Sequence, residues 1–199
     1  MINTMASSTP CWRNALGNFL ARRRMALLGM LLVSGMAAGE GIQVKSAELK
    51  LNNDTYELNA DIAVNLNRNL EDALKKGLYL HFQTELELSR PHSWWFDDTV
   101  VEATRASILS YHLLLRRYYL ETNYALKTYD TLGEALTALG HIEAWPVAEK
   151  KLLKPKQTYK GRLRLRLDLS QLPKPLQINA LTGAKWEAEG EWYEWKFEP

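Results

Sequence analysis

The sequence predicts a mainly β protein: an antiparallel, β-sandwich-like domain of about eight strands with two short helices, preceded by an N-terminal signal segment. Three observations predict it. Segments in which apolar and polar residues alternate recur along the chain, as in half-buried strands. These segments follow one another without the βαβ rhythm of a parallel sheet. An apolar run also follows three arginines near the N-terminus. We therefore divide the chain into a signal peptide or membrane anchor, residues 1–41, and a single β-rich domain, residues 42–199.

The N-terminal segment has the three parts of a secretory signal. Arg22–Arg24 precede an apolar run over residues 25–36, and small residues follow up to Gly41. The run is shorter than the ~18 residues expected of a membrane-spanning helix. We expect export by the general secretory route and cleavage before Glu40, which leaves the protein in the periplasm. An uncleaved segment, which would anchor the protein in the inner membrane, is the alternative.

Charge and cysteine content narrow the class of protein. The whole chain has a net charge of +2, from 25 basic and 23 acidic residues. Four of the basic residues, and none of the acidic ones, precede Glu40. The chain from Glu40 onward therefore has 21 basic and 23 acidic residues. A nearly neutral domain gives no reason to expect nucleic-acid binding. Cys11 is the only cysteine and lies before the apolar run. It therefore cannot carry a lipid at the cleavage site, and the exported domain would have no disulfide.

The first half of the domain is predicted to contain three strands and one helix. Residues 56–66 alternate in polarity, and Asn53-Asp54 marks a turn to a partner strand. A short helix is capped by Asn69 and stopped by Gly77. The expected elements are, in order, a strand over 47–51, a strand over 56–66, a helix over 69–77, a strand over 78–88 ended by Pro91, and an aromatic-rich connection over 90–98.

The second half is predicted to be richer in strands. Residues 99–129 are dense in β-branched and aromatic residues, which favours strands, although a helix over 106–118 is an alternative. Thr131 and Glu134 form a capping box that starts a helix. The expected elements are strands over 100–113 and 115–128, a helix over 131–140, a strand over 157–170, and last strands over 176–181 and 191–197.

Few residues suggest catalysis. The four histidines, His81, His92, His112 and His141, are not spaced as metal ligands, so we predict neither a metal site nor a cofactor. Asp97-Asp98, near His92, is the only compact polar cluster. Paired carboxylates can act as an acid and a base, but adjacent residues of a turn usually point apart and cap it. We predict no catalytic residue and keep a hydrolase as the alternative.

Two surface patterns are candidates for binding. Arg162, Arg164 and Arg166 share one face of a strand, where they would meet an acidic partner or an anionic headgroup, or pair across the sheet with Glu85 and Glu87. We favour the cross-strand pairing, because burial of the intervening leucines already explains the alternation.

Two aromatic clusters form the second pattern. Trp94, Trp95 and Phe96 precede Asp97, and Trp192, Tyr193 and Trp195 lie near the C-terminus. If they are exposed, such clusters form platforms for glycans or anchor protein partners. If they are buried, which is commoner for large apolar side chains, they fill the core. The candidate interaction surface comprises Trp94, Trp95, Phe96, Asp97, Arg162, Arg164 and Arg166.

Several motifs together resemble a bacterial family called domain of unknown function 4390 (DUF4390). They are Phe82 with Glu85 and Glu87, Trp94-Trp95-Phe96-Asp97, Leu113-Leu115-Arg117-Tyr118, Thr131-Leu132-Gly133-Glu134-Ala135-Leu136, Leu172-Pro173-Lys174-Pro175-Leu176-Gln177 and Trp192-Tyr193-Glu194-Trp195. The similarity spans roughly residues 40–199, and Lys196 stands where the family leads us to expect proline. The resemblance implies a small exported protein of Gram-negative bacteria with no assigned activity, often encoded near a membrane sensor kinase.

These observations favour a non-enzymatic binding or accessory module of the cell envelope. Its expected partner is an envelope or membrane protein such as a sensor, and it would contact the membrane only through its N-terminal segment. Two alternatives stay open. One is a periplasmic hydrolase that uses His92, Asp97 and Asp98. The other is a carrier of lipid or lipopolysaccharide in a cavity of the sandwich.

Overall fold

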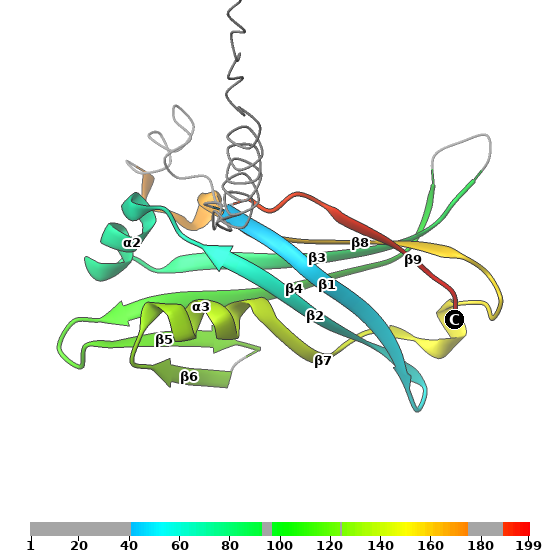
Figure 1. Cartoon of the computed structure of the whole chain (residues 1–199), viewed down its shortest axis with the longest axis horizontal. Coiled ribbons are helices and arrows are strands. Elements are labelled where there is room, and N and C mark those ends of the chain that lie inside the picture. The colour runs from blue at the N-terminus through cyan, green and yellow to red at the C-terminus, as the bar shows by residue number, and fades with distance from the viewer. Residues whose placement is uncertain (1–40, 93–96, 124, 175–188) are drawn as a thin grey trace, which may run out of the picture. The chain divides into compact units, whose positions relative to one another are not determined.

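A computed structural model describes residues 41–92, 97–123, 125–174 and 189–199. The chain divides into two compact units, Met1–Ala38 and Gly39–Pro199, and all the described residues belong to the second. Their fold is mainly β, with nine strands in two antiparallel sheets and two α-helices (Figure 1). The predicted fold class is confirmed.

The smaller sheet has three strands in the order β1-β2-β7. They are β1 (Gly41–Asn52), β2 (Thr55–Asn65) and β7 (His141–Glu149). A tight turn joins β1 to β2, and Asn53 adopts the left-handed conformation there, with a φ of 54°. Every second side chain of β2, from Tyr56 to Val64, is buried, as the alternation in the sequence predicts.

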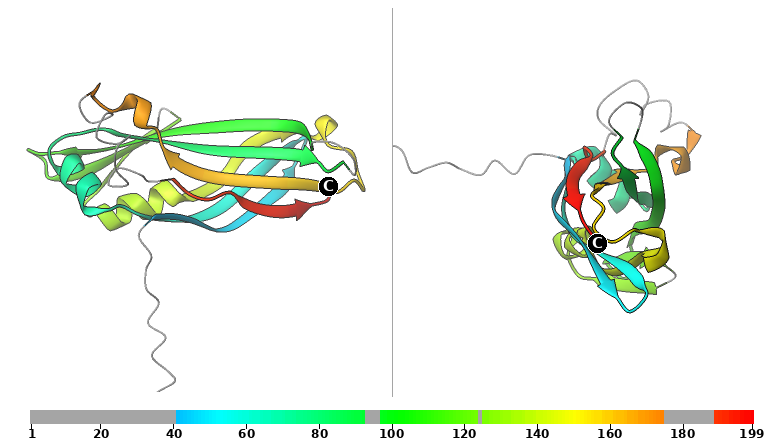
Figure 2. Two further views of the ribbon diagram at one scale, coloured as in Figure 1. Left: turned by 90° about the horizontal axis from the view of Figure 1, so that it is seen from above. Right: turned by 90° about the vertical axis from the view of Figure 1, so that its right-hand side faces the viewer.

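The larger sheet has six strands in the order β6-β5-β4-β3-β8-β9. They are β3 (Leu80–Arg90), β4 (Asp98–His112), β5 (Arg117–Thr122), β6 (Ala125–Tyr129), β8 (Tyr159–Leu167) and β9 (Tyr193–Phe197). In β3 and β8 the apolar side chains face inward and the charged ones outward. Strand β1 lies beside β8 and β9, and one hydrophobic core spans both sheets (Figure 2).

Two short α-helices cover parts of this core. Helix α2 (Arg68–Lys75) is capped by Asn67, whose side chain accepts a hydrogen bond from the backbone N–H of Leu70; the prediction of Asn69 as the cap is wrong by two residues. Helix α3 (Leu132–Gly140) has the expected capping box. It ends at Gly140, where a Cβ atom would overlap the carbonyl oxygen of Ile62. Glycine therefore lets α3 pack directly on β2. No helix among the described residues has the length and apolarity needed to cross a membrane.

Strand β7 was not predicted, because its buried residues are three apart rather than two. They are Ile142, Trp145 and Ala148. Two irregularities in its pairing with β2 cause this spacing, and at one of them Asn59 of β2 faces two residues of β7. Pro146, which cannot donate a ladder hydrogen bond, is tolerated because β7 lies at the edge of its sheet.

Three further differences concern the predicted strands. The strand predicted over 115–128 is a hairpin, β5 and β6, which turns at Asn123 with a φ of 48°. The alternative of a helix over 106–118 is wrong, because β4 continues to His112 and pairs with β3 and β5. The strand predicted over 176–181 lies outside the described residues.

Candidate functional site

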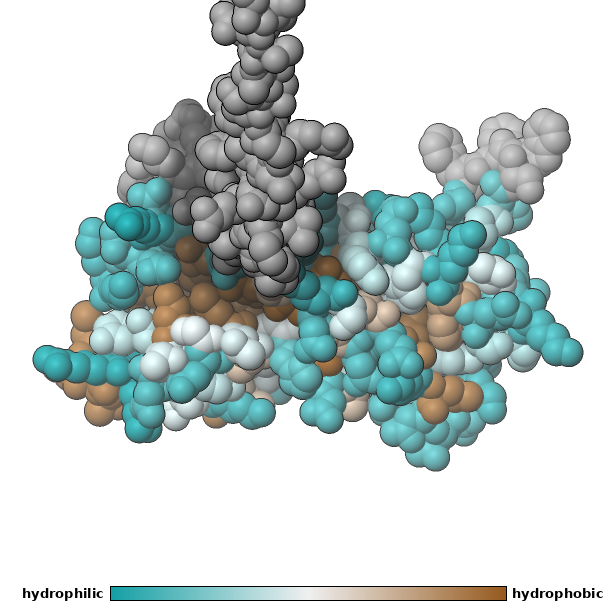
Figure 3. Space-filling model, viewed as in Figure 1, coloured by the Kyte–Doolittle hydropathy of each residue, from teal (hydrophilic) through white to brown (hydrophobic). Residues whose placement is uncertain are grey.

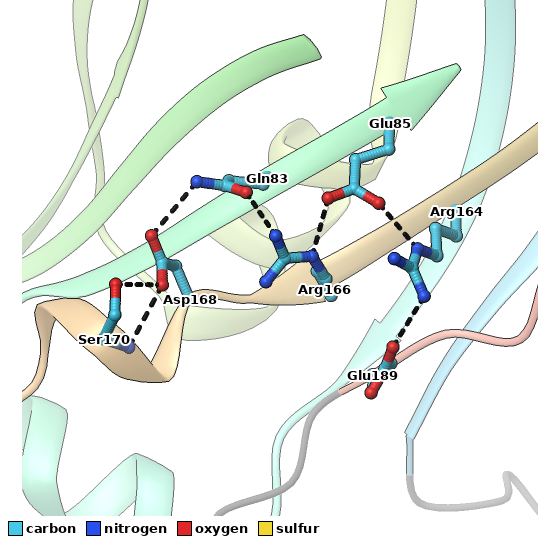
Figure 4. A network of polar contacts seen from close by, with 7 residues as sticks. All are labelled: Gln83, Glu85, Arg164, Arg166, Asp168, Ser170 and Glu189. Atoms are coloured by element: carbon cyan, nitrogen blue, oxygen red, sulfur yellow. Dashed lines mark hydrogen bonds and ion pairs between the residues drawn. The ribbon is translucent and has the colours of Figure 1, made fainter. Parts of the chain in front are cut away.

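The outer face of β3 and β8 carries a ladder of arginine and glutamate side chains, which we call the arginine ladder. Its members are Gln83, Glu85, Glu87, Arg162, Arg164 and Arg166. The antiparallel register places Glu85 opposite Arg164. Each carboxylate oxygen of Glu85 accepts a hydrogen bond of 2.7 Å, one from Nε of Arg164 and one from Nε of Arg166 (Figure 4). One carboxylate thus joins two arginines of the neighbouring strand.

The arginines of the ladder have further partners within the chain. Arg166 donates from Nη2 to Gln83 at 2.7 Å, and Arg164 donates from Nη1 to Glu189 at 2.7 Å. Arg162 donates from Nη1 to Glu87 at 3.1 Å. Its buried Nε lies 3.4 Å from Glu194, within ion-pair distance, but forms no hydrogen bond with the described residues.

With Lys160, which pairs with Glu194 at 2.9 Å, the ladder and its partners hold four basic and four acidic side chains. The favoured pairing of the arginines with Glu85 and Glu87 is confirmed. Among the described residues, the charges of this face and its partners therefore balance.

Glu85 is held in its ionised form by this arrangement. Its side chain is only 18% exposed, and burial by itself raises the pKa of the carboxyl group. The hydrogen bonds and charges of Arg166 and Arg164 outweigh burial and lower the pKa of Glu85 below its ordinary value. A group that stays charged in this way is a structural counter-ion rather than a proton donor.

A second carboxylate closes one end of the ladder. Asp168 accepts a hydrogen bond of 2.6 Å from the hydroxyl group of Ser170, which lowers the pKa of Asp168, and another of 3.0 Å from Gln83. An open cleft of ≈ 320 Å³ lies here, and Arg164, Arg166 and Glu189 also line it. The described residues that line this cleft include the Ser170 hydroxyl group, the Asp168 carboxylate and two arginines, which can bind polar groups. No histidine is among them.

Trp192 lies over two arginines of the ladder. The Cζ atoms of Arg162 and Arg164 are 4.4 and 4.3 Å from its ring centroid, within the range of cation–π contacts. The C-terminal aromatic cluster is thus divided between the two faces of the sheet. Tyr193 and Trp195 are half-buried against the core, and Trp195 occupies the space that a side chain at position 161 would need, which glycine leaves free.

The other sequence candidates lie in the chain between the end of β3 and the start of β4. Trp94, Trp95 and Phe96 lie outside the described residues. Asp97 is exposed, as are His92 and Asp98, and Asp98 forms a 3.8 Å ion pair with Arg90.

One polar pair was not predicted from the sequence. His141 lies with its Nδ1 2.8 Å from Oδ1 of Asp61, and both side chains are more than half exposed. They line two open clefts of ≈ 470 and ≈ 290 Å³ on the smaller sheet. No sequence signal could have found this pair, because it depends on the pairing of β7 with β2. No group of three potential metal ligands occurs within the described part of the chain.

The fold and the site define a class: a two-sheet β domain whose outer polar face is neutralised by its own side chains. The chain belongs to the family described as Domain of unknown function (DUF4390), which matches residues 39–196. The resemblance seen in the sequence is thereby confirmed. No curated protein and no solved structure matches the chain.

Proposed function

We propose that this protein is an exported, non-enzymatic binding module of the bacterial envelope that contacts a partner protein through the arginine ladder and Trp192. The proposed partner is the extracytoplasmic part of a membrane protein such as a sensor kinase. The proposed place is the periplasm, or the inner membrane if the N-terminal segment is not cleaved. Export is supported by the arrangement of Arg22–Arg24 and the apolar run that follows them.

The position of Trp192 is the observation that carries the proposal. Tryptophan and arginine are the residues most enriched at the centres of protein interfaces. Here two guanidinium groups, themselves fixed by glutamates, hold the half-buried ring. A side chain that is already ordered loses little entropy on binding, so this face is prepared for a partner.

The positions of the described residues support the two alternative functions, a hydrolase and a lipid carrier, less well. The hydrolase needs His92, Asp97 and Asp98 to converge, yet none of them lines the three clefts described above, and Asp98 is paired with Arg90. The lipid carrier needs an enclosed apolar cavity, and these three clefts are all open to solvent.

Site-specific photocrosslinking in cells tests the binding proposal. A photoreactive residue at Lys196, which is exposed on β9 opposite Lys160, is expected to capture an envelope protein. The same residue at Lys50, exposed on β1, is the matched control. The Trp192→Ala variant should abolish capture from position 196 while its melting temperature stays close to that of the wild type. Equal capture from both positions, or capture that does not change in Trp192→Ala, would contradict the proposal.

Export has a separate test. The intact mass of the protein recovered from the periplasmic fraction should correspond to a chain that begins at Glu40. A full-length mass in the inner-membrane fraction would support the anchor instead, and recovery from the cytoplasm alone would contradict export.

A further inference from the structure

The turn between β4 and β5 exposes three consecutive leucines, which we call the leucine tip. Leu113, Leu114 and Leu115 are 60%, 89% and 59% exposed. The turn extends beyond the last pair of the hairpin, His112 and Arg117, at one end of the larger sheet (Figure 1). Hydrophobic surface is visible at the corresponding edge of the molecule in Figure 3. Single exposed leucines are ordinary in soluble proteins, but three together at a protruding turn are not.

The leucine tip has a defined conformation. The backbone N–H of Arg116 donates to the carbonyl oxygen of His112 at 2.8 Å, and that of Leu115 donates to Nδ1 of the same histidine at 3.2 Å. Arg116 has a left-handed φ of 51°, which returns the chain to β5. The backbone that carries the exposed leucines is therefore held by the fold, so little backbone entropy is lost when the tip makes a contact.

Basic and aromatic side chains surround the base of the leucine tip. Arg116 takes part in none of the ion pairs found among the described residues, and Arg117 pairs with the exposed Asp130 at 2.9 Å. The ring of the half-buried Tyr111 is tilted against that of the buried Tyr118, with 4.8 Å between centroids, and the ring of His112 is tilted against that of the half-buried Tyr119 at 5.9 Å. The tip thus has apolar side chains at its end, with arginines and the half-buried Tyr111 and Tyr119 at its base. This order matches the layers of a membrane interface.

We propose that the leucine tip inserts into the surface of a lipid bilayer that contains anionic lipids. A convex tip fits between lipid headgroups, whereas a protein partner that covered it would have to offer a groove. Arg116 supplies the charge complementarity, because its guanidinium can pair with an anionic headgroup at the depth where the leucines enter the apolar region. This inference goes beyond the proposed function, since it assigns a membrane contact to the folded domain and not only to the N-terminal segment.

The test uses the full chain with one environment-sensitive fluorophore. A nitrobenzoxadiazole label is attached at position 114 in a Cys11→Ser, Leu114→Cys variant. The matched control carries the label at Leu152, a 45% exposed leucine of the short helix η1 (Lys150–Leu152), at the other end of the sheets in Figures 1 and 2. Vesicles of phosphatidylethanolamine and phosphatidylglycerol are added, with phosphatidylcholine vesicles as the neutral comparison.

The label at position 114 should shift to shorter wavelength and be quenched by lipids with a spin label on the acyl chain, and the label at position 152 should not change. Neutral vesicles should give a weaker response. Adding Arg116→Glu should lower the apparent partition constant of the tip on the order of tenfold.

Three results would overturn the proposal. A label at position 114 that stays in water shows that the tip does not insert. Equal responses at positions 114 and 152 show a general effect of the vesicles. A shift at position 114 that grows with protein concentration without vesicles shows that a second copy of the chain covers the tip.

Discussion

The arginine ladder and the leucine tip belong to the same six-stranded sheet, yet they meet the solvent in opposite ways. The ladder has three arginines, and each of them, like the neighbouring Lys160, is paired with an acidic side chain of the same chain. The tip gathers three leucines that lie in solvent. The ion pairs of the ladder hold its arginines, and with them Trp192, in one arrangement. The leucines of the tip are instead exposed apolar side chains on an ordered turn.

Loss of Glu85 should have the largest effect on stability. Glu85→Ala leaves Arg164 and Arg166 partly buried without their shared acceptor. We expect the free energy of unfolding, measured by urea titration, to fall by about 2–3 kcal/mol.

Glu48→Ala is the control for this prediction. Glu48 pairs with Lys50, but both side chains are mostly exposed, at 64% and 59%. Its removal should change the free energy of unfolding by no more than about 0.5 kcal/mol. Equal losses in the two variants would mean that the ladder stabilises the fold no more than an ordinary surface ion pair does.

Acid should weaken the ladder. The pKa of Glu85 is lowered in the folded protein, so its contribution to stability is present above the ordinary pKa of 4.5 and is lost as pH falls through the lower folded value. In Glu85→Gln this group cannot titrate. The free energy of unfolding of that variant should therefore fall less between about pH 7 and about pH 3 than that of the wild type. Parallel acid curves for the two proteins would show that Glu85 has an ordinary pKa in the fold.

Trp192 should matter less for stability than for binding. Trp192→Ala removes two cation–π contacts from a half-buried side chain, and we expect it to lower the free energy of unfolding by about 1 kcal/mol. Trp192→Phe keeps an aromatic ring over the arginines and should recover part of this loss. A loss of more than about 3 kcal/mol in Trp192→Ala would place the ring in the core instead of on a contact face.

The regular strands of this fold were predictable because buried and exposed side chains alternate along them without interruption. In β3 and β8 the side chains alternate over the whole strand, so both the buried leucines and the outward pairing of Glu85 with the arginines follow from the sequence. Strand β7, in which this alternation is interrupted, was not predicted. The bulges of β7 space its buried residues like those of a helix, and the pairing of Asp61 with His141 was missed with that strand.

The candidate site was predictable in its residues but not in its charge balance. The arginines were identified, and so was their pairing with Glu85 and Glu87. The ion pairs that Glu189 and Glu194 add depend on the return of the chain near β9, which no local pattern encodes. The boundary between the strands predicted over 100–113 and 115–128 agrees with the turn at the leucine tip. The sequence did not show that these leucines are exposed, because apolar residues predict burial.

The smallest effect is expected at the leucine tip, and it tests the contrast between the two regions most directly. The free energy of unfolding of a Leu113→Ser, Leu114→Ser, Leu115→Ser variant should be measured beside that of Glu85→Ala. If the leucines of the tip pack against no other side chains, the free energy of unfolding of this variant should lie within about 0.5 kcal/mol of that of the wild type. Glu85→Ala should show a clear loss beside it. A loss of about 2 kcal/mol or more in the tip variant, as for buried leucines, would contradict the assignment of the tip as a free contact surface.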